Sequence, residues 1–587
     1  MSDNNDIEKL VGVLKGFKPG KPLKKHITHV RFPKFKGIEP GTQINFDFPF
    51  TALVGANGIG KSSVLHALWG MPFGYTTSKF WFATDLDPIE GTIKNPQRFV
   101  YGHWNEAYKN VVETRKARLG RKEDYWEPYR SSAADGMAPM PAKKYEGMSK
   151  DRWNPVRRDV VYINFKMTFG SFDRYFYTEE AGKDTDRRAT MKLEARRLKK
   201  IVRLGLKSYK TGRRERVYEN RPLTEEELKH VSRILGRTYE SAHIVKHSLY
   251  PGNRGQDLSV VFRRGLEYSE AFAGSGEIAA VSAVVQILSA PKNSLILLDE
   301  PETSLHPGAQ RALLYFLLEQ IKLKFHQVVI STHSSDFLDG MPPEAIKVFE
   351  ENSSGQTRVI DKCSPYVALH RLGRPSGDKL RVLVEDPLAE AFVRHAAKAL
   401  DKGEADVLEV KVAPGGAKAL ISHHGTAAMA SGDDVYLLLD GDMQKVGAFV
   451  ERDTIAPADY NRLDEILLEQ LGSAPKFLLA GGNDVAGHEQ ASIKAHLDYL
   501  EWVAARLRYL PRKCPEEVLL NFLSAEECAK VTDSESAKTL LREYLCEGQE
   551  LNAQEIFVLE KFHVAKIPLD NPDLESIRDV LRGWIHQ

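Results

Sequence analysis

Residues 51–70 read TALVGANGIGKSSVLHALWG, and this stretch indicates how the first half of the chain folds. Its first four residues form an apolar run that is typical of a buried strand, and residues 62–70 have apolar side chains at helical spacing. The glycines between them fit the pattern G-x-x-x-x-G-K-[ST], in which backbone N–H groups curl around phosphates at a helix N-terminus. A strand, a phosphate-binding loop and a helix in this order predict a nucleotide site.

The side chains of this loop suit ATP and Mg²⁺ as cofactors. Lys61 would reach the β- and γ-phosphates, and the hydroxyl of Ser62 would ligate Mg²⁺. The residues that we expect to hold the nucleotide are Gly55, Asn57, Gly58, Gly60, Lys61, Ser62 and Ser63.

Two later strands supply the acids and the histidine that such a site needs. In SLILLDE, residues 294–300, Asp299 would hold the Mg²⁺ shell and Glu300 would orient the attacking water. QVVIST, residues 327–332, ends next to His333, which would contact the γ-phosphate. Because a helical segment precedes each strand, this half of the chain is predicted to be α/β with a parallel sheet.

Four segments, GANGIGKSS, AGSGE, LLDEPETSLHP and STHSSDFL, resemble the P-loop, signature, Walker B/D-loop and switch motifs of ABC-type ATPases related to SMC proteins. The resemblance spans about residues 25–350. It implies that two ATPase heads sandwich ATP, with the signature residues Ser275, Gly276 and Glu277 of one head completing the site of the other. It therefore implies a homodimer or higher oligomer, although the signature lacks the family's initial Leu-Ser pair and no Q-loop glutamine is identifiable.

The first domain, residues 1–365, is longer than a bare ATPase core. Lys61 and Asp299 lie 238 residues apart, which predicts a large insertion over about residues 75–265. The insertion lacks heptads, so a long coiled coil is not expected. Residues 187–216 carry thirteen Lys or Arg against two acids, a pattern that fits either a phosphate-backbone contact or a solvated helix face. The residues there that we assign to nucleic acid are Arg196, Arg197, Lys199 and Lys200.

A second α/β pattern fills residues 366–587. Glu385 follows the strand-like run RVLV, and Asp440 and Asp442 follow VYLLL. Acids at the carboxyl ends of adjacent parallel strands converge, and carboxylate oxygens suit Mg²⁺ or Mn²⁺. Two such ions would stabilise both oxygens of a reacting phosphodiester, whereas each acid by itself is an ordinary strand-end residue. The elements predicted to complete this domain are a strand over residues 476–482 and a helical region over about residues 487–587.

This second part resembles a Toprim domain, the fold shared by topoisomerases, primases and some nucleases. Glu385 matches its first-strand glutamate, and Asp440-Gly441-Asp442 matches its D-x-D motif. The resemblance implies metal ligation by these three acids. Further residues assigned on the same basis are Glu517 as a ligand, Glu390 as either a ligand or a solvent-facing acid, and Lys418 as a phosphate contact.

An ABC-type ATPase followed by a Toprim domain resembles the OLD (overcoming lysogenisation defect) family of nucleases. The family implies ATP-regulated, metal-dependent DNA cleavage, and its relatives include the Gabija nuclease and retron-associated effectors that act in defence against phage. DNA and a second ATPase head are therefore the expected partners. A second protein or an RNA–DNA hybrid stays open as a further partner.

Two other functions stay open from the residues alone. A topoisomerase-like enzyme needs a tyrosine nucleophile, and none of Tyr499, Tyr509 and Tyr544 lies in a recognisable winged-helix context. An ATP-sensing scaffold with an inactive Toprim fold fits the altered residues around Glu385. Cleavage that is lost in Glu385→Ala would separate a nuclease from this scaffold.

Composition excludes several other classes of protein. Of the 587 residues, 42% are hydrophobic and 28% are charged, which is a globular balance, and no apolar run approaches membrane-spanning length. The four cysteines contain no C-x-x-C pair, and the N-terminus lacks the layout of a secretion signal. We therefore expect a cytoplasmic protein that has neither a zinc ribbon nor a disulfide scaffold. The net charge of +2 does not bear on nucleic-acid binding.

Overall fold

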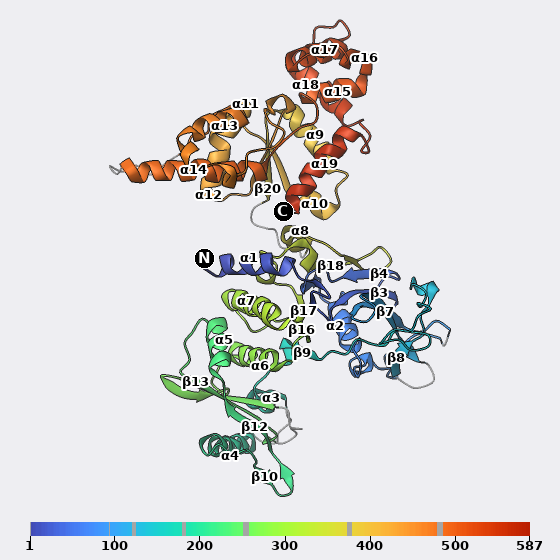
Figure 1. The fold of residues 1–587 in the computed structure, drawn as a ribbon, viewed down its shortest axis with the longest axis vertical. Coiled ribbons are helices and arrows are strands. Elements are labelled where there is room, and N and C mark those ends of the chain that lie inside the picture. Colours follow the sequence, from blue (N-terminus) through green and yellow to red (C-terminus); the bar gives the residue numbers. More distant parts are fainter. Residues whose placement is uncertain are drawn as a thin grey trace. The chain divides into compact units, whose positions relative to one another are not determined.

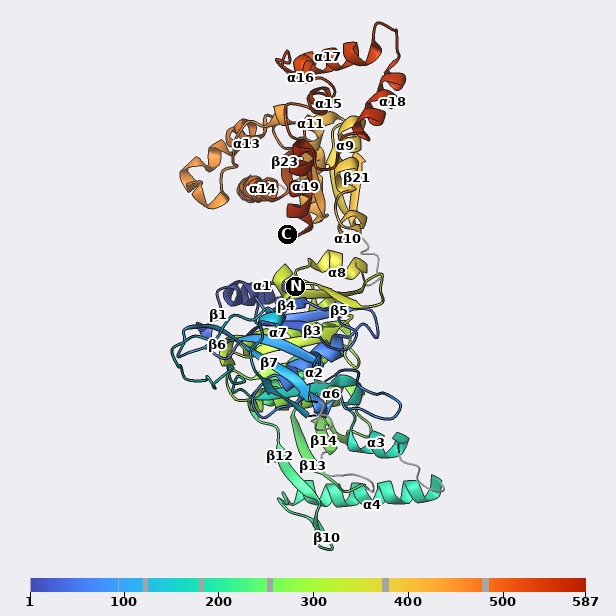
Figure 2. The same cartoon turned by 90° about the vertical axis from the view of Figure 1, so that its right-hand side faces the viewer.

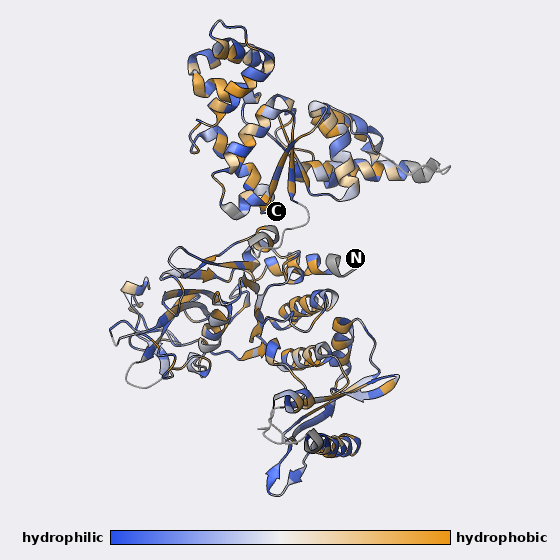
Figure 3. Cartoon of the chain, turned by 180° about the vertical axis from the view of Figure 1, so that it is seen from behind, coloured by the Kyte–Doolittle hydropathy of each residue, from blue (hydrophilic) through white to orange (hydrophobic). Residues whose placement is uncertain are grey.

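The computed structural model describes residues 2–92, 94–119, 125–178, 184–250, 257–371, 379–477 and 485–586. Its contacts divide the chain into two compact units, Met1–Ala368 and Leu369–Gln587, and each unit is an α/β fold (Figure 1). No helix in the described ranges has both the length and the apolar character of a membrane span. Helices in both units carry apolar and polar stripes, as the hydropathy colouring in Figure 3 shows.

The core of unit 1 is a six-stranded sheet in the order β19-β18-β5-β17-β16-β9. All neighbours except β19 and β18 pair in parallel, which confirms the predicted parallel sheet. Strands β5, β16 and β17 are buried along their whole length, because helices cover both faces. The strand bounds are β5 Phe50–Gly55, β9 Val160–Asn164, β16 Leu295–Asp299, β17 Gln327–Thr332, β18 Ile346–Glu351 and β19 Thr357–Ile360.

Helices stack along the two sides of this sheet (Figure 1). Helix α2 (Lys61–Gly70) lies on one side and contacts β5, β16 and β17. Helices α1, α6 and α7 lie on the other side, and α1 packs against α7. Their bounds are α1 Ser2–Lys15, α6 Ser275–Ser289 and α7 Pro307–Lys324. The short strands β1 Lys18–Pro19 and β2 Pro22–Leu23 follow α1, and α8 Pro365–Arg371 spans the boundary between the two units in the sequence.

A second sheet of unit 1 corrects the prediction of one continuous insertion over residues 75–265. It is antiparallel in the order β4-β3-β6-β7-β8, so residues 98–129 extend a sheet that begins before the P-loop. Strand β9 also belongs to the central sheet. The aromatic residues of this region, including Phe35, Phe99 and Trp126, pack into the core with α2. The strands are β3 Ile27–Lys34, β4 Thr42–Asn45, β6 Arg98–Asn105, β7 Asn110–Leu119 and β8 Tyr125–Tyr129.

Residues 171–269, which contain the later part of the predicted insertion, include a separate antiparallel sheet in the order β12-β13-β14-β15. Helix α4 (Asp184–Arg203) packs Leu198 and Ile201 against Val217 and Val245 of this sheet (Figure 2). Helix α5 begins after its N-cap Thr224, whose side chain accepts the backbone N–H of Glu227. The other elements are α3 Ser171–Thr178, β10 Lys210–Thr211, β11 Arg214–Glu215, β12 Val217–Pro222, α5 Glu225–Leu235, β13 Ser241–His247, β14 Asp257–Arg264 and β15 Leu266–Ser269.

Unit 2 is built on a parallel sheet in the order β21-β20-β22-β23. Of the predicted strand over residues 476–482, residues 476 and 477 are irregular and residues 478–482 lie outside the described ranges. The fourth strand of the described sheet, β23 (Leu507–Tyr509), pairs with β22. The other elements are β20 Leu380–Val384, α9 Pro387–Ala397, α10 Lys402–Asp406, β21 Leu408–Val412, α11 Gly416–Ala419, α12 Thr426–Ser431, β22 Val435–Leu439, α13 Leu463–Leu471 and α14 Val485–Arg506.

The C-terminal part of unit 2 is helical, as predicted. Helices α18 and α19 contact α9, and α15 packs against α17. The imidazole of His395 on α9 forms a hydrogen bond of 2.8 Å with the carbonyl of Ile567. The helices are α15 Pro515–Leu523, α16 Ala525–Cys528, α17 Ser534–Cys546, α18 Ala553–Val564 and α19 Pro572–Ile585.

Candidate functional site

The P-loop connects strand β5 to helix α2 and depends on its glycines. Gly60 has a φ of 99°, a left-handed conformation that glycine adopts without strain. A Cβ atom on Gly55 would lie 2.7 Å from the carbonyl oxygen of Phe349, so only glycine fits there. Lys61 is nearly buried, and its ammonium donates to the carbonyls of Gly55 at 2.7 Å and Ala56 at 2.8 Å. The loop thus holds its lysine over its own backbone.

The two residues predicted to ligate Mg²⁺ lie together. The hydroxyl of Ser62 donates to Oδ1 of Asp299 at 3.1 Å. Asp299 is buried at the end of β16, where it also accepts hydrogen bonds from Ser331 and, at 3.0 Å, from the hydroxyl of Tyr162. Three hydroxyl groups therefore orient this carboxylate. Tyr162 was not predicted, although its strand neighbours β16.

The residues predicted for catalysis of ATP hydrolysis lie beside Lys61. Its ammonium donates to Nε2 of His333 at 3.0 Å, and that nitrogen lies 3.9 Å from Oε1 of Glu300. The same oxygen of Glu300 forms an ion pair of 2.6 Å with Lys166. Burial lowers the pKa of Lys61 to about 8, although Glu300, Glu302 and Asp299 favour its charged form. The site therefore gathers two lysines, three acids and a histidine.

Glu302 is a site residue that the sequence reasoning missed, although it stands inside the quoted LLDEPETSLHP segment. Its carboxylate accepts the backbone N–H of His333 at 2.6 Å and the hydroxyl of Thr332 at 2.9 Å. Burial raises the pKa of Glu302. Glu302 thus fixes the backbone at the end of β17, which places His333.

The signature residues begin helix α6. A Cβ atom on Gly276 would lie 2.5 Å from the carbonyl oxygen of Ser304, so this position needs glycine. Glu277 accepts hydrogen bonds from the N–H of Gly274 at 2.8 Å and from the hydroxyls of Tyr239 and Tyr268 at 2.5 and 2.7 Å. Ser275 is the first residue of the helix. The remaining loop residues are Asn57 and Gly58, which are exposed, and Ser63, whose hydroxyl accepts from Lys36 at 3.0 Å.

In unit 2, Glu385 links two segments at the carboxyl edge of the parallel sheet. One carboxylate oxygen accepts the N–H of Asp440 at 2.8 Å, and the other accepts the N–H of Ala417 at 3.1 Å. Burial raises the pKa of Glu385, and the negative charges of Asp442 and Asp386 act in the same direction. Glu385 therefore holds the D-x-D segment beside the glycine turn at residues 415–416.

Asp440 is the most perturbed acid of this group. Its side chain is 7% exposed, and its Oδ1 atom has no hydrogen-bond partner in the part of the chain that the structure describes. Burial raises the pKa of Asp440 to about 9, with further contributions from Glu385, Asp386 and Glu516. Asp442 accepts a hydrogen bond of 2.5 Å from Ser534. Negative charge therefore accumulates around Asp440 without a cation in hydrogen-bond contact among the described residues.

Two of the acids considered as ligands, Glu390 and Glu517, contact residues outside the Asp440 group. Glu390 pairs with Arg394 at 2.7 Å, and Glu517 accepts the N–H of Lys513 at 2.8 Å. Glu516, the neighbour of Glu517, is close enough to Asp440 for its charge to raise the pKa of Asp440, and its Oε2 atom has no partner among the described residues. Both glutamates stand in the first turn of α15, so sequence spacing alone did not distinguish them.

A bound cation would need side-chain adjustments in this group. Across the described ranges, no three His, Cys, Asp or Glu side chains already converge closely enough to hold one ion. The donor set still fits Mg²⁺ or Mn²⁺, because it consists of carboxylates and includes a buried oxygen without a partner. Lys418, the predicted phosphate contact, is exposed on α11.

The predicted nucleic-acid residues lie on α4. Arg196, Lys199 and Lys200 are exposed, whereas Arg197 pairs with the buried carboxylate of Glu194 at 2.7 Å, so its charge is already compensated. Residues 188, 192, 196, 199 and 203 recur at helical spacing, and all are exposed Lys or Arg. We call these five residues the basic stripe. No ion pair joins them to an acid within the described ranges.

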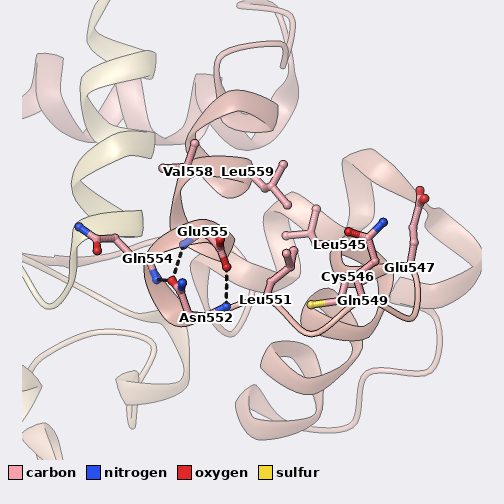
Figure 4. A pocket seen from close by; sticks show the side chains of 10 residues that line it. All are labelled: Leu545, Cys546, Glu547, Gln549, Leu551, Asn552, Gln554, Glu555, Val558 and Leu559. Atoms are coloured by element: carbon pink, nitrogen blue, oxygen red, sulfur yellow. Dashed lines mark hydrogen bonds between the residues drawn. The ribbon is translucent and has the colours of Figure 1, made fainter.

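A hollow of about 610 Å³ lies between α17 and α18 (Figure 4). Its apolar wall includes Leu551 and Val558. Its polar residues Asn552 and Glu555 form the cap of α18, in which Asn552 accepts the N–H of Glu555 at 3.0 Å and Glu555 accepts the N–H of Asn552 at 2.9 Å. Because none of the predicted site residues lines this hollow, it is not a candidate for nucleotide or metal.

Residues 50–339 match the family model described as "AAA domain, putative AbiEii toxin, Type IV TA system". This part of the chain has a P-loop ATPase-like fold. The match contains every ATPase motif identified from the sequence and no residue of unit 2. Together with the contacts among Lys61, Ser62 and Asp299, it supports ATP binding and ATPase activity, for which Mg²⁺ is the usual cation.

The chain also resembles solved SMC heads at low levels of similarity. The SMC head domain from Thermotoga maritima is 14% identical, with a TM-score of 0.29, over 57% of this chain and 98% of that one. An SmcHead bound to the C-winged helix domain of ScpA is 16% identical, with a TM-score of 0.33, over 57% and 97%. An Smc head with an extended coiled coil, bound to the C-terminal domain of ScpA derived from Pyrococcus furiosus, is 14% identical, with a TM-score of 0.33, over 57% and 96%. No curated protein matches the chain.

Proposed function

We propose that the protein is an ATP-hydrolysing, divalent-metal-dependent DNA nuclease of the OLD type. In this proposal the ATPase site of unit 1 gates cleavage, and the acids of unit 2 cut the phosphodiester. The observation that best supports nuclease activity is the environment of Asp440, which lies among other acids at the carboxyl edge of a parallel sheet. Its carboxyl group is nearly buried, and one of its oxygens has no hydrogen-bond partner among the described residues. Burial disfavours the ionised form of such a carboxyl group, and a bound cation would stabilise that form by compensating its negative charge.

In unit 1, each contact has a role in ATP hydrolysis. Lys61 and the P-loop N–H groups bind the phosphates, and Ser62 with Asp299 holds the metal shell. Glu300 orients the attacking water, and His333 lies close enough to Lys61 to contact the γ-phosphate. The signature residues Ser275, Gly276 and Glu277 complete the site of a second copy, so head dimerisation is part of the proposal.

In unit 2, Asp440, Asp442 and Glu516 would hold Mg²⁺ or Mn²⁺. Such an ion, when bound, supplies Lewis-acid stabilisation of the phosphodiester oxygens and lowers the pKa of water. Glu385 keeps the D-x-D backbone in place through its two N–H contacts. Lys418 is exposed on α11, where it can contact a phosphate of the substrate.

The basic stripe on α4 is the proposed DNA-backbone contact. Five exposed cations at helical spacing present a continuous positive face, which phosphates favour through counterion release. The first and last of these residues are fifteen positions apart, which on a helix is roughly 22 Å. A face of this length spans several phosphates along one strand.

The proposed setting is defence against phage in the cytoplasm. The OLD resemblance supports this setting, and the description of the matched family refers to a toxin of a type IV toxin–antitoxin system. A nuclease that is restrained until a trigger arrives fits both descriptions. A second protein or an RNA–DNA hybrid is the proposed form of that trigger.

A second candidate function is an ATP-sensing scaffold with an inactive Toprim fold. It is favoured by Glu385, whose two oxygens each accept a backbone N–H, and by Glu390 and Glu517, whose carboxylates contact Arg394 and Lys513. A topoisomerase-like enzyme is not favoured. Tyr499 is fully buried and donates its hydroxyl proton to a backbone carbonyl, so it is not placed as a nucleophile.

A nuclease assay on plasmid and linear DNA tests the proposal. Wild-type protein and Asp440→Asn/Asp442→Asn protein are incubated with Mg²⁺ or Mn²⁺, with and without ATP. We expect metal-dependent cutting that the double variant lacks, and a change with ATP that shows whether nucleotide drives or restrains it. Glu517→Gln is the matched control, because this glutamate contacts Lys513 instead of the Asp440 group. Equal cutting by wild type and double variant would contradict the nuclease, and no cutting by either would favour the scaffold.

A further inference from the structure

Lys166 lies in the ATPase site although no motif of the sequence indicated it. Strand β9 pairs in parallel with β16 so that Asn164 faces Asp299. The chain leaves both strands at the same edge, and Lys166, two residues beyond Asn164, reaches Glu300, one residue beyond Asp299. The pairing register thus places this ammonium at the acid expected to orient the attacking water.

Four groups form an unbroken row across the site. The ammonium of Lys61 contacts His333 at 3.0 Å, His333 lies 3.9 Å from Glu300, and Glu300 contacts Lys166 at 2.6 Å. The two lysines stand at the ends of this row, and the charge of Lys166 contributes to the lowered pKa of Lys61. A γ-phosphate that contacts Lys61 and His333 therefore arrives next to the Lys166–Glu300 pair.

The side chains of Lys166 and Glu300 differ in how easily they can move. The side chain of Lys166 is 50% exposed, whereas that of Glu300 is 18% exposed. Glu300 also has a φ of 50°, an uncommon conformation for a residue other than glycine, so its position is fixed by the backbone. The lysine, with its long flexible stem, is the partner that can move to a new anion.

We propose that Lys166 is a positioning residue that responds to the γ-phosphate of ATP. Before ATP binds, Lys166 holds the Glu300 carboxylate in an ion pair. The γ-phosphate draws this ammonium to itself, and Glu300 is then free to accept a hydrogen bond from the attacking water. ADP has no γ-phosphate, so the ion pair between Lys166 and Glu300 stays intact when ADP is bound. This inference rests on the proposed ATPase function and names the device that couples its catalytic acid to the bound nucleotide.

Binding of ATP and ADP to the full-length protein, measured by competition with a fluorescent nucleotide in the presence of Mg²⁺, tests the inference. Removing one charge-assisted hydrogen bond lowers affinity by about tenfold, so Lys166→Met should lower the preference for ATP over ADP by about that factor. Lys166→Arg keeps the cation and should retain the preference. Glu300→Gln should tighten binding of ATP but not of ADP, because its Lys166 no longer has a competing carboxylate.

The double variant Lys166→Met/Glu300→Gln tests whether the two residues act through one contact. If they do, the gain in ATP affinity caused by Glu300→Gln should disappear in the double variant. An unchanged ATP preference in Lys166→Met, or a gain that persists in the double variant, would overturn the inference while leaving the ATPase proposal intact. Wild-type protein that binds neither nucleotide would overturn both. Because Lys166 is half exposed, its variants should unfold at the wild-type temperature.

Discussion

The acids of unit 1 and those of unit 2 differ in how many hydrogen-bond and ion-pair partners the surrounding residues give them. Asp299 accepts from three hydroxyl groups and Glu300 pairs with Lys166, so these carboxylates are compensated by the protein itself. Asp440 and Glu516 in unit 2 each have an oxygen without a partner among the described residues. The ATPase site is therefore preorganised, whereas the second site holds a buried, incompletely paired carboxyl group whose charged form a bound cation would stabilise.

Lys61→Ala is expected to have the largest effect. It removes the ammonium that would contact the β- and γ-phosphates, so ATP affinity should fall by about 100-fold or more. Asp440→Asn should leave ATP affinity at the wild-type value, because it changes only the second site. Isothermal titration of both variants with ATP checks this. ATP binding that persists in Lys61→Ala would contradict the P-loop assignment.

The next effect is on stability without metal. Asp440→Asn should raise the melting temperature in a chelating buffer, because it replaces a buried, incompletely paired carboxyl group by an amide. Asp299→Asn should lower it, because the amide cannot replace the charged acceptor of Ser62, Ser331 and Tyr162. We expect shifts of a few degrees, at roughly 2–4 °C per kcal/mol for domains of this size. Calorimetry of the two variants side by side measures them, and shifts of the same sign would remove the contrast between the sites.

The two units should also respond oppositely to pH. Burial lowers the pKa of His26 in unit 1 to about 4, below its unfolded value of 6.5, so unit 1 loses stability as pH falls through that range. Asp440 has its pKa raised to about 9, so unit 2 loses stability as pH rises from about 4 towards 9. Two thermal transitions followed in a chelating buffer between about pH 5 and pH 8 should therefore move in opposite directions. Asp440→Asn should flatten the response of unit 2, and parallel responses of the two units would argue against the raised pKa of Asp440.

The smallest expected effect concerns the basic stripe. Arg196→Gln, Lys199→Gln and Arg203→Gln together should weaken DNA binding and lower the salt slope by up to about three, at roughly 0.9 for each phosphate that is no longer neutralised. Fluorescence anisotropy at several salt concentrations measures the slope. Lys322→Gln on α7 is the control for a change of charge alone. An unchanged slope would return the stripe to the solvated-surface interpretation.

Local signals in the sequence were sufficient for much of the fold. The P-loop and the strands before Asp299 and His333 depend on neighbouring residues, and they were predicted correctly. The pairing of β23 with β22 was missed, because three residues carry too little pattern to indicate a strand. The sheet that joins β3 and β4 to β6–β8 was missed because its partners lie on both sides of the P-loop in the sequence.

For the two sites, the sequence predicted which residue types take part, but it did not predict which way each side chain points. Glu516 and Glu517 are chemically identical and adjacent, and only the packing of α15 decides which one lies by Asp440. Arg197 belongs to the basic run, yet its position on the helix turns it towards Glu194. Lys166 reaches Glu300 through the register of two strands that are far apart in sequence. The positions of Glu516 and Lys166 depend on tertiary contacts that a pattern of residues does not contain, whereas Arg197 and Glu194 are three residues apart on one helix.

Strand β15 ends at Ser269 and α6 begins at Ser275, so only five residues separate the sheet that carries α4 from the signature helix. One of the five, Glu270, is buried and accepts hydrogen bonds from Ser171 at 2.9 Å and Ser259 at 2.5 Å. This short segment, held by the buried Glu270, ties the end of β15 closely to the start of α6. We therefore expect a displacement of the sheet, such as one imposed by a bound polyanion, to be felt at Ser275.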